Sequence, residues 1–233
     1  MMQLTFDLPR RIAFSRTDFL ISDSNAAAVS WMDRWPDWPA RALALHGPAG
    51  CGKTHLLHVW CERAAGVIVP GEALSEEEVA CLVSEHRHRI AIDDADRADE
   101  RALLHLYNFC MEIRGSLVMA ARQRPASWTV ELPDLDSRLR AVLAIGIGLP
   151  DDALLGAVLV KHFADRQLRV APEAIAYLLT HMERSFAAAA EMASMLDLVS
   201  LRDRRAITVP LARRFVSEAG SQSSSSARDS GVT

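Results

Sequence analysis

The eight residues 47–54, with the sequence GPAGCGKT, constrain the fold of this chain more than any other stretch. They match the phosphate-binding pattern G-x-x-x-x-G-K-[ST], and they lie between an apolar run at 42–45 and a helix-compatible run at 55–60. The glycines allow backbone N–H groups to turn inward around a phosphate, and the start of the following helix adds partial positive charge there. The order strand, loop, helix therefore predicts a nucleotide site rather than a simple Gly/Pro turn before a helix.

The pattern assigns roles to the polar residues of this loop. Lys53 is expected to reach the terminal phosphates of the nucleotide, and the Thr54 hydroxyl is expected to ligate Mg²⁺. The remaining residues that we predict to contact the nucleotide here are Gly47, Pro48, Gly50, Gly52 and His55.

A second part of a nucleoside-triphosphatase site follows another apolar run. Residues 89–92 are typical of a buried strand, and Asp93 and Asp94 come directly after it. Asp93 is expected to hold the Mg²⁺ shell through water, and Asp94 lies where a base could polarise the attacking water. Two aspartates after a strand are common in turns, so this signal depends on the phosphate-binding loop upstream.

Strands alternate with helices up to about residue 150. The predicted strands are 42–45, 67–69, 89–92, 116–121 and 144–149. This alternation predicts an α/β domain, residues 11–150, with a five-stranded parallel sheet covered by helices on both faces. Only helical patterns follow, so residues 151–219 are predicted to form a small all-helical domain. Residues 220–233 are serine-rich and poor in apolar side chains, which predicts disorder.

Composition limits the classes of function. The chain has 233 residues and a formal net charge of -4, so it lacks the surplus of basic residues that favours direct DNA binding. Its four cysteines form no C-x-x-C pair, which indicates neither a disulfide framework nor a zinc site. No run reaches the roughly 18 apolar residues of a membrane span, and no signal peptide is recognisable. We therefore expect a cytoplasmic protein.

Two apolar clusters leave alternatives open. Leu4, Phe6 and Leu8 alternate, which suits either an edge strand packed on its own domain or an exposed peptide that docks in a partner's groove, with Gln3 as its polar anchor. The alternation by itself favours the edge strand. The three tryptophans of residues 31–38 could stack on a base or pack in a core, and packing is favoured because Trp buries much apolar area.

These motifs together resemble the AAA+ ATPases of the DnaA replication-initiator clade, and within it the Hda-type regulators. The resemblance covers nearly the whole chain up to about Ala219. It is carried by the segments 19–25 and 53–57, by Asp93-Asp94 and by Ser137-Arg138. The resemblance implies an AAA+ nucleotide-binding domain, a helical lid, and ADP or ATP with Mg²⁺ between the two.

The resemblance also implies partners. Arg138 resembles the arginine finger that AAA+ proteins offer to a neighbour's nucleotide, whereas without the resemblance it would be an ordinary surface or salt-bridge arginine. Residues 1–10 contain Gln3-Leu4-Thr5-Phe6-Asp7-Leu8, which is similar to the peptide that binds the sliding clamp of DNA polymerase III, and this reverses the preference for an edge strand. The implied partners are therefore the DnaA initiator and the clamp, and a homodimer is left open. A complete initiator would continue into a DNA-binding domain after the lid, so a regulator is expected here.

Two departures from the family pattern bear on hydrolysis. Residues 120–122, Ala-Ala-Arg, stand where the clade carries a polar sensor, and Ala187 stands where the lid usually carries a phosphate-contacting arginine. Arg184 lies about one helical turn earlier and is the candidate to substitute for it. We therefore expect a protein that binds ADP or ATP, hydrolyses it weakly or not at all, and stimulates hydrolysis by DnaA. The alternatives are a helicase loader or remodeller that hydrolyses ATP itself, and a non-catalytic adaptor that binds the initiator.

Overall fold

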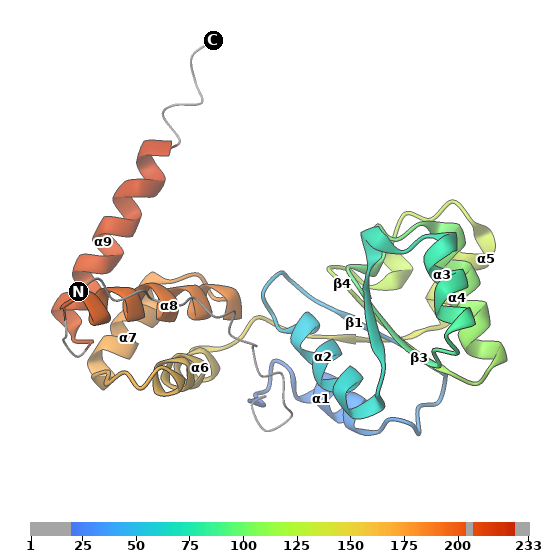
Figure 1. Ribbon diagram of the computed structural model, residues 1–233, viewed down its shortest axis with the longest axis horizontal. Coiled ribbons are helices and arrows are strands. Elements are labelled where there is room, and N and C mark those ends of the chain that lie inside the picture. Colours follow the sequence, from blue (N-terminus) through green and yellow to red (C-terminus); the bar gives the residue numbers. More distant parts are fainter. Residues whose placement is uncertain (1–19, 204–206, 227–233) are drawn as a thin grey trace, which may run out of the picture.

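The computed structural model describes residues 20–203 and 207–226. The predicted clamp-binding peptide, residues 1–10, lies outside these ranges. Figure 1 shows an α/β domain beside a smaller helical domain, and one segment of chain joins them between strand β5 (Leu143–Gly146) and helix α6 (Asp152–Asp165).

The described strands form one parallel sheet in the order β2-β3-β4-β1-β5. The bounds of the other strands are β1 Ala42–His46, β2 Val67–Pro70, β3 Arg89–Asp93 and β4 Ser116–Ala121. The predicted α/β class and its five-stranded parallel sheet are confirmed. Since parallel strands end at a common edge, the loop after β1 and the two aspartates at the end of β3 meet at the carboxyl edge of the sheet.

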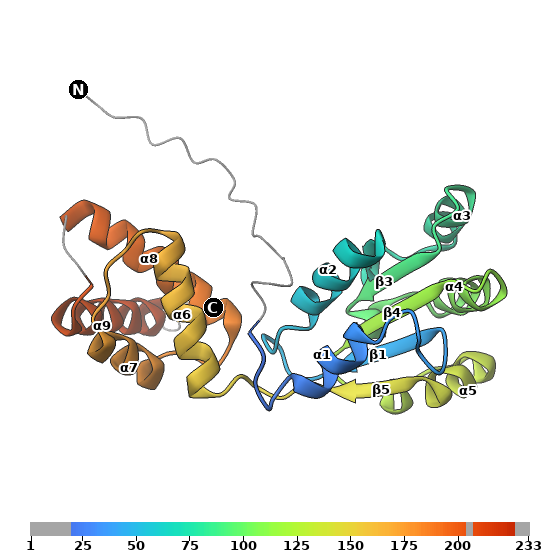
Figure 2. The ribbon, with the colours of Figure 1, turned by 90° about the horizontal axis from the view of Figure 1, so that it is seen from below.

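Helices cover both faces of the sheet, and a hydrophobic core lies under each set. The covering helices are α1 (Ala26–Asp33), α2 (Lys53–Ala64), α3 (Glu76–Ser84), α4 (Glu100–Glu112) and α5 (Pro133–Ala141). Figure 2 shows α1 and α2 on one side, and α3, α4 and α5 toward the other. The described part of this domain also contains three short 3₁₀ helices, at Gly71–Ala73, Ala95–Arg97 and Pro125–Ser127. Every residue of β4 is buried, as expected for a central strand covered on both faces.

The tryptophans of residues 31–38 belong to the core beneath α1 and α2, which confirms the predicted packing role. Trp38 stacks on Trp60 with 5.9 Å between the ring centroids, and Trp35 meets the same ring edge-on at 6.0 Å. The Trp35 Nε1 donates to the Ser116 hydroxyl over 3.0 Å, so α1 and its following turn are tied to the start of β4.

In its described residues, the helical domain contains α6 and three further helices around its own apolar core. They are α7 (Pro172–His181), α8 (Phe186–Asp203) and α9 (Val209–Ser226). Asp151 caps α6, because its carboxylate accepts the backbone N–H of Leu154 over 2.7 Å. The predicted helical domain after the sheet is therefore confirmed.

Several elements differ from the sequence expectations. Strand β5 ends at Gly146, three residues before the end expected at Leu149. Helix α9 continues to Ser226, beyond the end expected near Ala219, because serine-rich composition argues against burial rather than against helical backbone. Helix α5 is not predicted by the pattern, since its residues are mostly polar and only Leu135 and Leu139 are buried. Within the described ranges, no helix is long and apolar enough to cross a membrane.

Candidate functional site

The phosphate-binding loop lies at the carboxyl edge, between β1 and α2. Gly50 and Gly52 have φ angles of 71° and 97°, in the left-handed region that favours glycine. At Gly47 an added Cβ would lie 2.2 Å from the backbone oxygen of Ile147, so a side chain cannot fit there. The loop thus needs its glycines for backbone conformation and for close approach of the neighbouring chain.

Lys53 lies inside the loop, with 7% of its surface exposed. Its ammonium group donates to the carbonyl oxygens of Gly47 and Pro48, each over 2.9 Å. As the first residue of α2, it also stands at the positive end of that helix. The loop therefore concentrates an ammonium charge and helix-terminal N–H groups in one place, which suits phosphate oxygens.

Thr54 and Asp93 lie together, as a shared magnesium site requires. The Thr54 hydroxyl donates to Asp93 Oδ2 over 2.7 Å, although the two residues come from α2 and from the end of β3. A hydroxyl and a carboxylate are hard oxygen ligands of the kind that Mg²⁺ accepts together with nucleotide oxygens and water. These residues fit the expected ion, which would polarise the phosphates when bound with nucleotide.

Asp94 is placed where the sequence predicts, directly beside Asp93 at the carboxyl edge. It is exposed, and its φ of 48° is in the left-handed region, which aspartate tolerates better than most residues. Its backbone N–H donates to Asp93 Oδ1 over 3.2 Å. Asp94 therefore has access to solvent, which its predicted role with an attacking water requires.

The helical domain touches the phosphate-binding loop through the start of α8. The Phe186 N–H donates to the Gly50 carbonyl oxygen over 3.2 Å, and Ser185 is buried against the same glycine. The Phe186 ring lies beside Gly52, where an added Cβ would be 3.1 Å from ring atom Cε2. Sequence reasoning missed these two residues, because their role arises from a contact between domains.

Arg184 and His55 complete the predicted nucleotide residues. Arg184 is exposed and ion-paired with Asp152, with 3.0 Å between its guanidinium nitrogen and Oδ1, so both partners lie in the helical domain. His55 is half-buried in the first turn of α2, one residue after Thr54. Their contact with a nucleotide stays a prediction.

His46 is a residue of this edge that sequence reasoning missed. It ends β1 directly before Gly47, and it is paired in register with Ala121 and Gly146. Burial lowers its pKa, and the positive charge of Arg124 lowers it further. A neutral imidazole next to the loop is therefore favoured near neutral pH, and its position one residue before the motif is the signal that could have found it.

Arg138 belongs to α5. Figures 1 and 2 show that helix on the side of the α/β domain away from the helical domain. It is half-buried, and its Nε donates to Asn108 Oδ1 on α4 over 2.9 Å. A second guanidinium nitrogen donates to the backbone oxygen of Asp134 over 3.1 Å. The guanidinium is thus held in a defined pose in a separate region from the chain's own phosphate-binding loop.

The comparison with protein families now decides the nature of the second domain. Residues 152–216 match the family described as "Hda, lid domain", a range that includes α6, α7, α8 and the start of α9. The helical domain is therefore similar to the Hda lid domain.

Solved structures extend this likeness to the whole fold. Domain III of the replication initiation protein DnaA from Thermotoga maritima aligns with a TM-score of 0.72 and 14% identity, covering 88% of this chain and 96% of that one. AMPPCP-bound DnaA from Aquifex aeolicus aligns with a TM-score of 0.66 and 15% identity, covering 79% and 65%. At these identities the likeness shows the fold. The expected fold, an α/β domain followed by a helical domain that matches the Hda lid model, is confirmed.

A relative by sequence is an uncharacterized protein of Haemophilus influenzae. It is 26% identical over 185 residues, which are 73% of this chain and 79% of the relative.

Proposed function

We propose that this protein regulates the initiation of replication by presenting Arg138 to the ATP bound by a DnaA initiator. The observation that carries the proposal is the Arg138 guanidinium on α5, which Asn108 of α4 holds away from the chain's own phosphate-binding loop. The match of the helical domain to the Hda lid model supports it. In that position Arg138 can serve the nucleotide of another molecule. The result would be faster conversion of ATP-bound initiator to its ADP form.

The proposed chemistry is electrostatic. In phosphoryl transfer, negative charge spreads over the equatorial oxygens of the moving group, and a guanidinium beside them stabilises that charge. Such a group is worth about 10³- to 10⁵-fold in rate. In this proposal Arg138 exchanges its bonds to Asn108 and the Asp134 carbonyl oxygen for phosphate oxygens, so it does not have to be ordered from a disordered chain.

The chain's own site is proposed to hold ADP or ATP as a structural ligand. Lys53 would meet the phosphates, Thr54 and Asp93 would hold Mg²⁺, and the lid would cover the loop through Ser185 and Phe186. Ala187 provides no guanidinium at the expected lid position, and Arg184 is engaged with Asp152. This combination supports nucleotide retention with weak hydrolysis.

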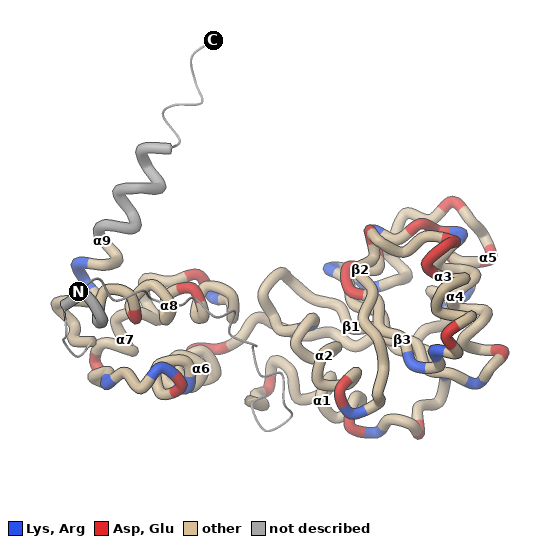
Figure 3. Tube along the Cα trace, in the orientation of Figure 1, with Lys and Arg blue, Asp and Glu red and all other residues tan. Residues whose placement is uncertain are grey.

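The sliding clamp is the second proposed partner, bound through Gln3, Leu4, Phe6 and Leu8. The proposal rests on the sequence of that peptide alone. Both charge signs are interspersed along the described part of the α/β domain in Figure 3, which agrees with protein partners rather than with a DNA-binding surface.

The test is a reconstitution of initiator, clamp loaded on DNA, ATP and this protein. Arg138→Ala should reduce stimulated hydrolysis by about 10³-fold, because the transition-state charge loses its partner. Arg140→Ala is the matched control, since Arg140 lies on the same helix in an exposed pair with Asp136, and it should leave the rate unchanged. Unchanged stimulation by Arg138→Ala would rule out the proposed finger. Vigorous hydrolysis by the protein alone, abolished by Lys53→Ala, would instead favour a loader or remodeller.

A further inference from the structure

Helix α4 holds the segment that carries Arg138 at two separate points. Asn108, in the second half of α4, accepts from the Arg138 guanidinium. Glu100, the first residue of α4, accepts from the chain that leads into α5. The two residues are about two turns, or roughly 12 Å, apart along the helix.

One carboxylate, that of Glu100, accepts hydrogen bonds from two successive backbone N–H groups, and we call this set of bonds the bracket. Glu131 N donates to both carboxylate oxygens over 3.0 Å, and Leu132 N donates to Oε2 over 2.9 Å. Leu132 is the N-cap residue of α5, and its apolar side chain makes no capping hydrogen bond. The acceptor for this entry segment therefore comes from a different helix.

The carboxylate is itself well placed at the start of α4. Asp99 caps that helix by accepting the Ala102 N–H over 2.9 Å, and the positive end of the helix favours a negative charge in its first turn. Glu100 is half-buried, and its long side chain spans from α4 to the backbone before Pro133. The bracket thus fixes where α5 begins relative to α4.

We propose that Glu100 is a positioning residue for Arg138: its bracket sets the start of α5, so that the guanidinium reaches a partner's nucleotide in the productive pose. This inference rests on the proposed function. Without the bracket the entry segment would shift, and Arg138 would still carry its charge but at a displaced position. Transition-state stabilisation is sensitive to such shifts, since a displacement of about 1 Å can cost on the order of 100-fold.

The test measures two quantities in the reconstituted reaction: the maximal rate of initiator ATP hydrolysis, and the concentration of this protein that gives half of it. Glu100→Ala should lower the maximal rate about tenfold, and it should change the half-maximal concentration by less than about twofold. Glu100→Gln should restore most of the rate, because its carbonyl oxygen can still accept an N–H. Glu112→Ala, at the exposed end of the same helix, is the matched control and should behave as the wild type.

Two further variants keep the inference open to refutation. Glu100→Asp retains the negative charge at the start of α4, so it preserves folding, but it is too short to hold the bracket and should slow hydrolysis. In an Arg138→Ala background, Glu100→Ala should cause no further loss, because both changes remove the same interaction. A wild-type maximal rate for Glu100→Ala or Glu100→Asp, or a further tenfold loss in the double variant, would overturn the positioning role. Normal stimulation by Arg138→Ala would instead overturn the proposed function.

Discussion

The phosphate-binding loop and the α5 surface present positive charge in opposite ways. Lys53 is almost fully buried, and its ammonium group is bound to carbonyl oxygens of its own loop. Arg138 is half-buried on a surface helix and is held by Asn108 from a neighbouring helix. In our proposal, the first arrangement binds a nucleotide of this chain, and the second offers a charge to another molecule. A protein with both can bind one nucleotide and act on another.

Loss of Lys53 should have a large effect confined to the first region. Lys53→Ala removes the ammonium group that is predicted to meet the phosphates, so nucleotide affinity should fall about 100-fold, which is near 3 kcal/mol. Titration with a fluorescent ADP analogue measures this. Lys161→Ala, which removes a half-exposed lysine of the lid paired with Asp165, is the control and should bind normally. Equal affinity for both variants would contradict the assignment of the loop.

The contact between the loop and the lid should break when Gly50 gains a side chain. Gly50→Ala places a Cβ 2.4 Å from the Ser185 Cβ and requires a strained φ of 71°. The free energy of unfolding should fall by about 1–3 kcal/mol. Urea denaturation is the measurement. Gly148→Ala is the matched control, because its nearest neighbour would be an ordinary 3.5 Å away at Ser24. If both variants unfold alike, the lid does not rest on the loop.

Low pH should reduce the free energy of unfolding through two histidines, one beside the phosphate-binding loop and one in the lid. Burial lowers the pKa of both His46 and His162, and Arg124 and Arg166 lower them further. Below about pH 6.5 these histidines bind protons more readily in the unfolded chain than in the folded one. The free energy of unfolding should therefore fall as the pH drops from 7.5 to 5.5. Thermal unfolding of the double variant His46→Gln/His162→Gln should show a shallower loss. An unchanged pH dependence would exclude these groups as the cause.

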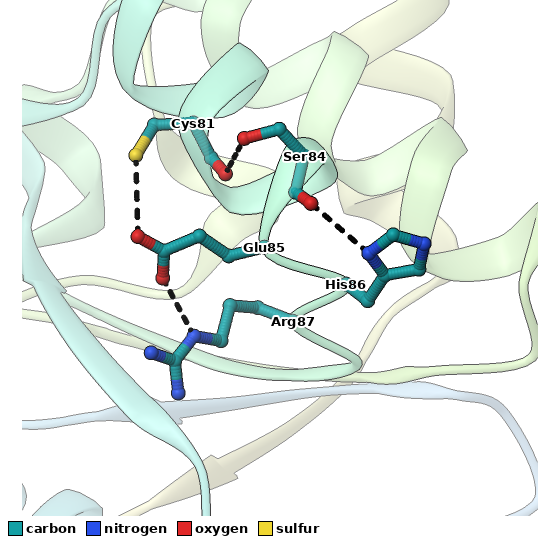
Figure 4. A network of polar contacts seen from close by, with 5 residues as sticks. All are labelled: Cys81, Ser84, Glu85, His86 and Arg87. Atoms are coloured by element: carbon teal, nitrogen blue, oxygen red, sulfur yellow. Dashed lines mark hydrogen bonds and ion pairs between the residues drawn. The ribbon is translucent and has the colours of Figure 1, made fainter.

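A smaller effect is expected at a surface that belongs to neither region, around the end of α3. Cys81 is exposed, and its thiol lies 3.7 Å from Glu85 Oε1, as Figure 4 shows. The Glu85 charge raises the pKa of the Cys81 thiol, so less thiolate is present at pH 8. Glu85→Gln should speed alkylation of Cys81 by a few fold, without affecting nucleotide binding or initiator stimulation. Slower alkylation would contradict the assigned cause.

Most of the fold could be predicted from the sequence because its determinants are local. The loop pattern fixes strand, loop and helix, and apolar runs such as 116–121 mark buried strands without reference to distant residues. The resemblance on Ser137-Arg138 then places a candidate finger. Helix α5 escapes prediction because only Leu135 and Leu139 are buried in it, so its apolar pattern is weak.

The parts of the site that could not be predicted depend on contacts between distant segments. Thr54 and Asp93 can be paired in advance, since the loop pattern and the strand-end aspartates both predict ligands of the same Mg²⁺. Nothing in the sequence indicates that Asn108 and Glu100 hold the α5 segment, because these are tertiary hydrogen bonds without a local pattern. The contact between Ser185 and Gly50 likewise depends on how the lid packs against the phosphate-binding loop.

The most direct test of the central claim follows the label on one nucleotide. Initiator is loaded with labelled ATP and this protein with unlabelled ADP, and the two are mixed with clamp on DNA for a single turnover. The wild type should convert the initiator's label to ADP, whereas Arg138→Ala should leave it at the rate of initiator alone. Conversion by Arg138→Ala as fast as by the wild type would contradict the claim that this chain acts through Arg138 on another protein's ATP.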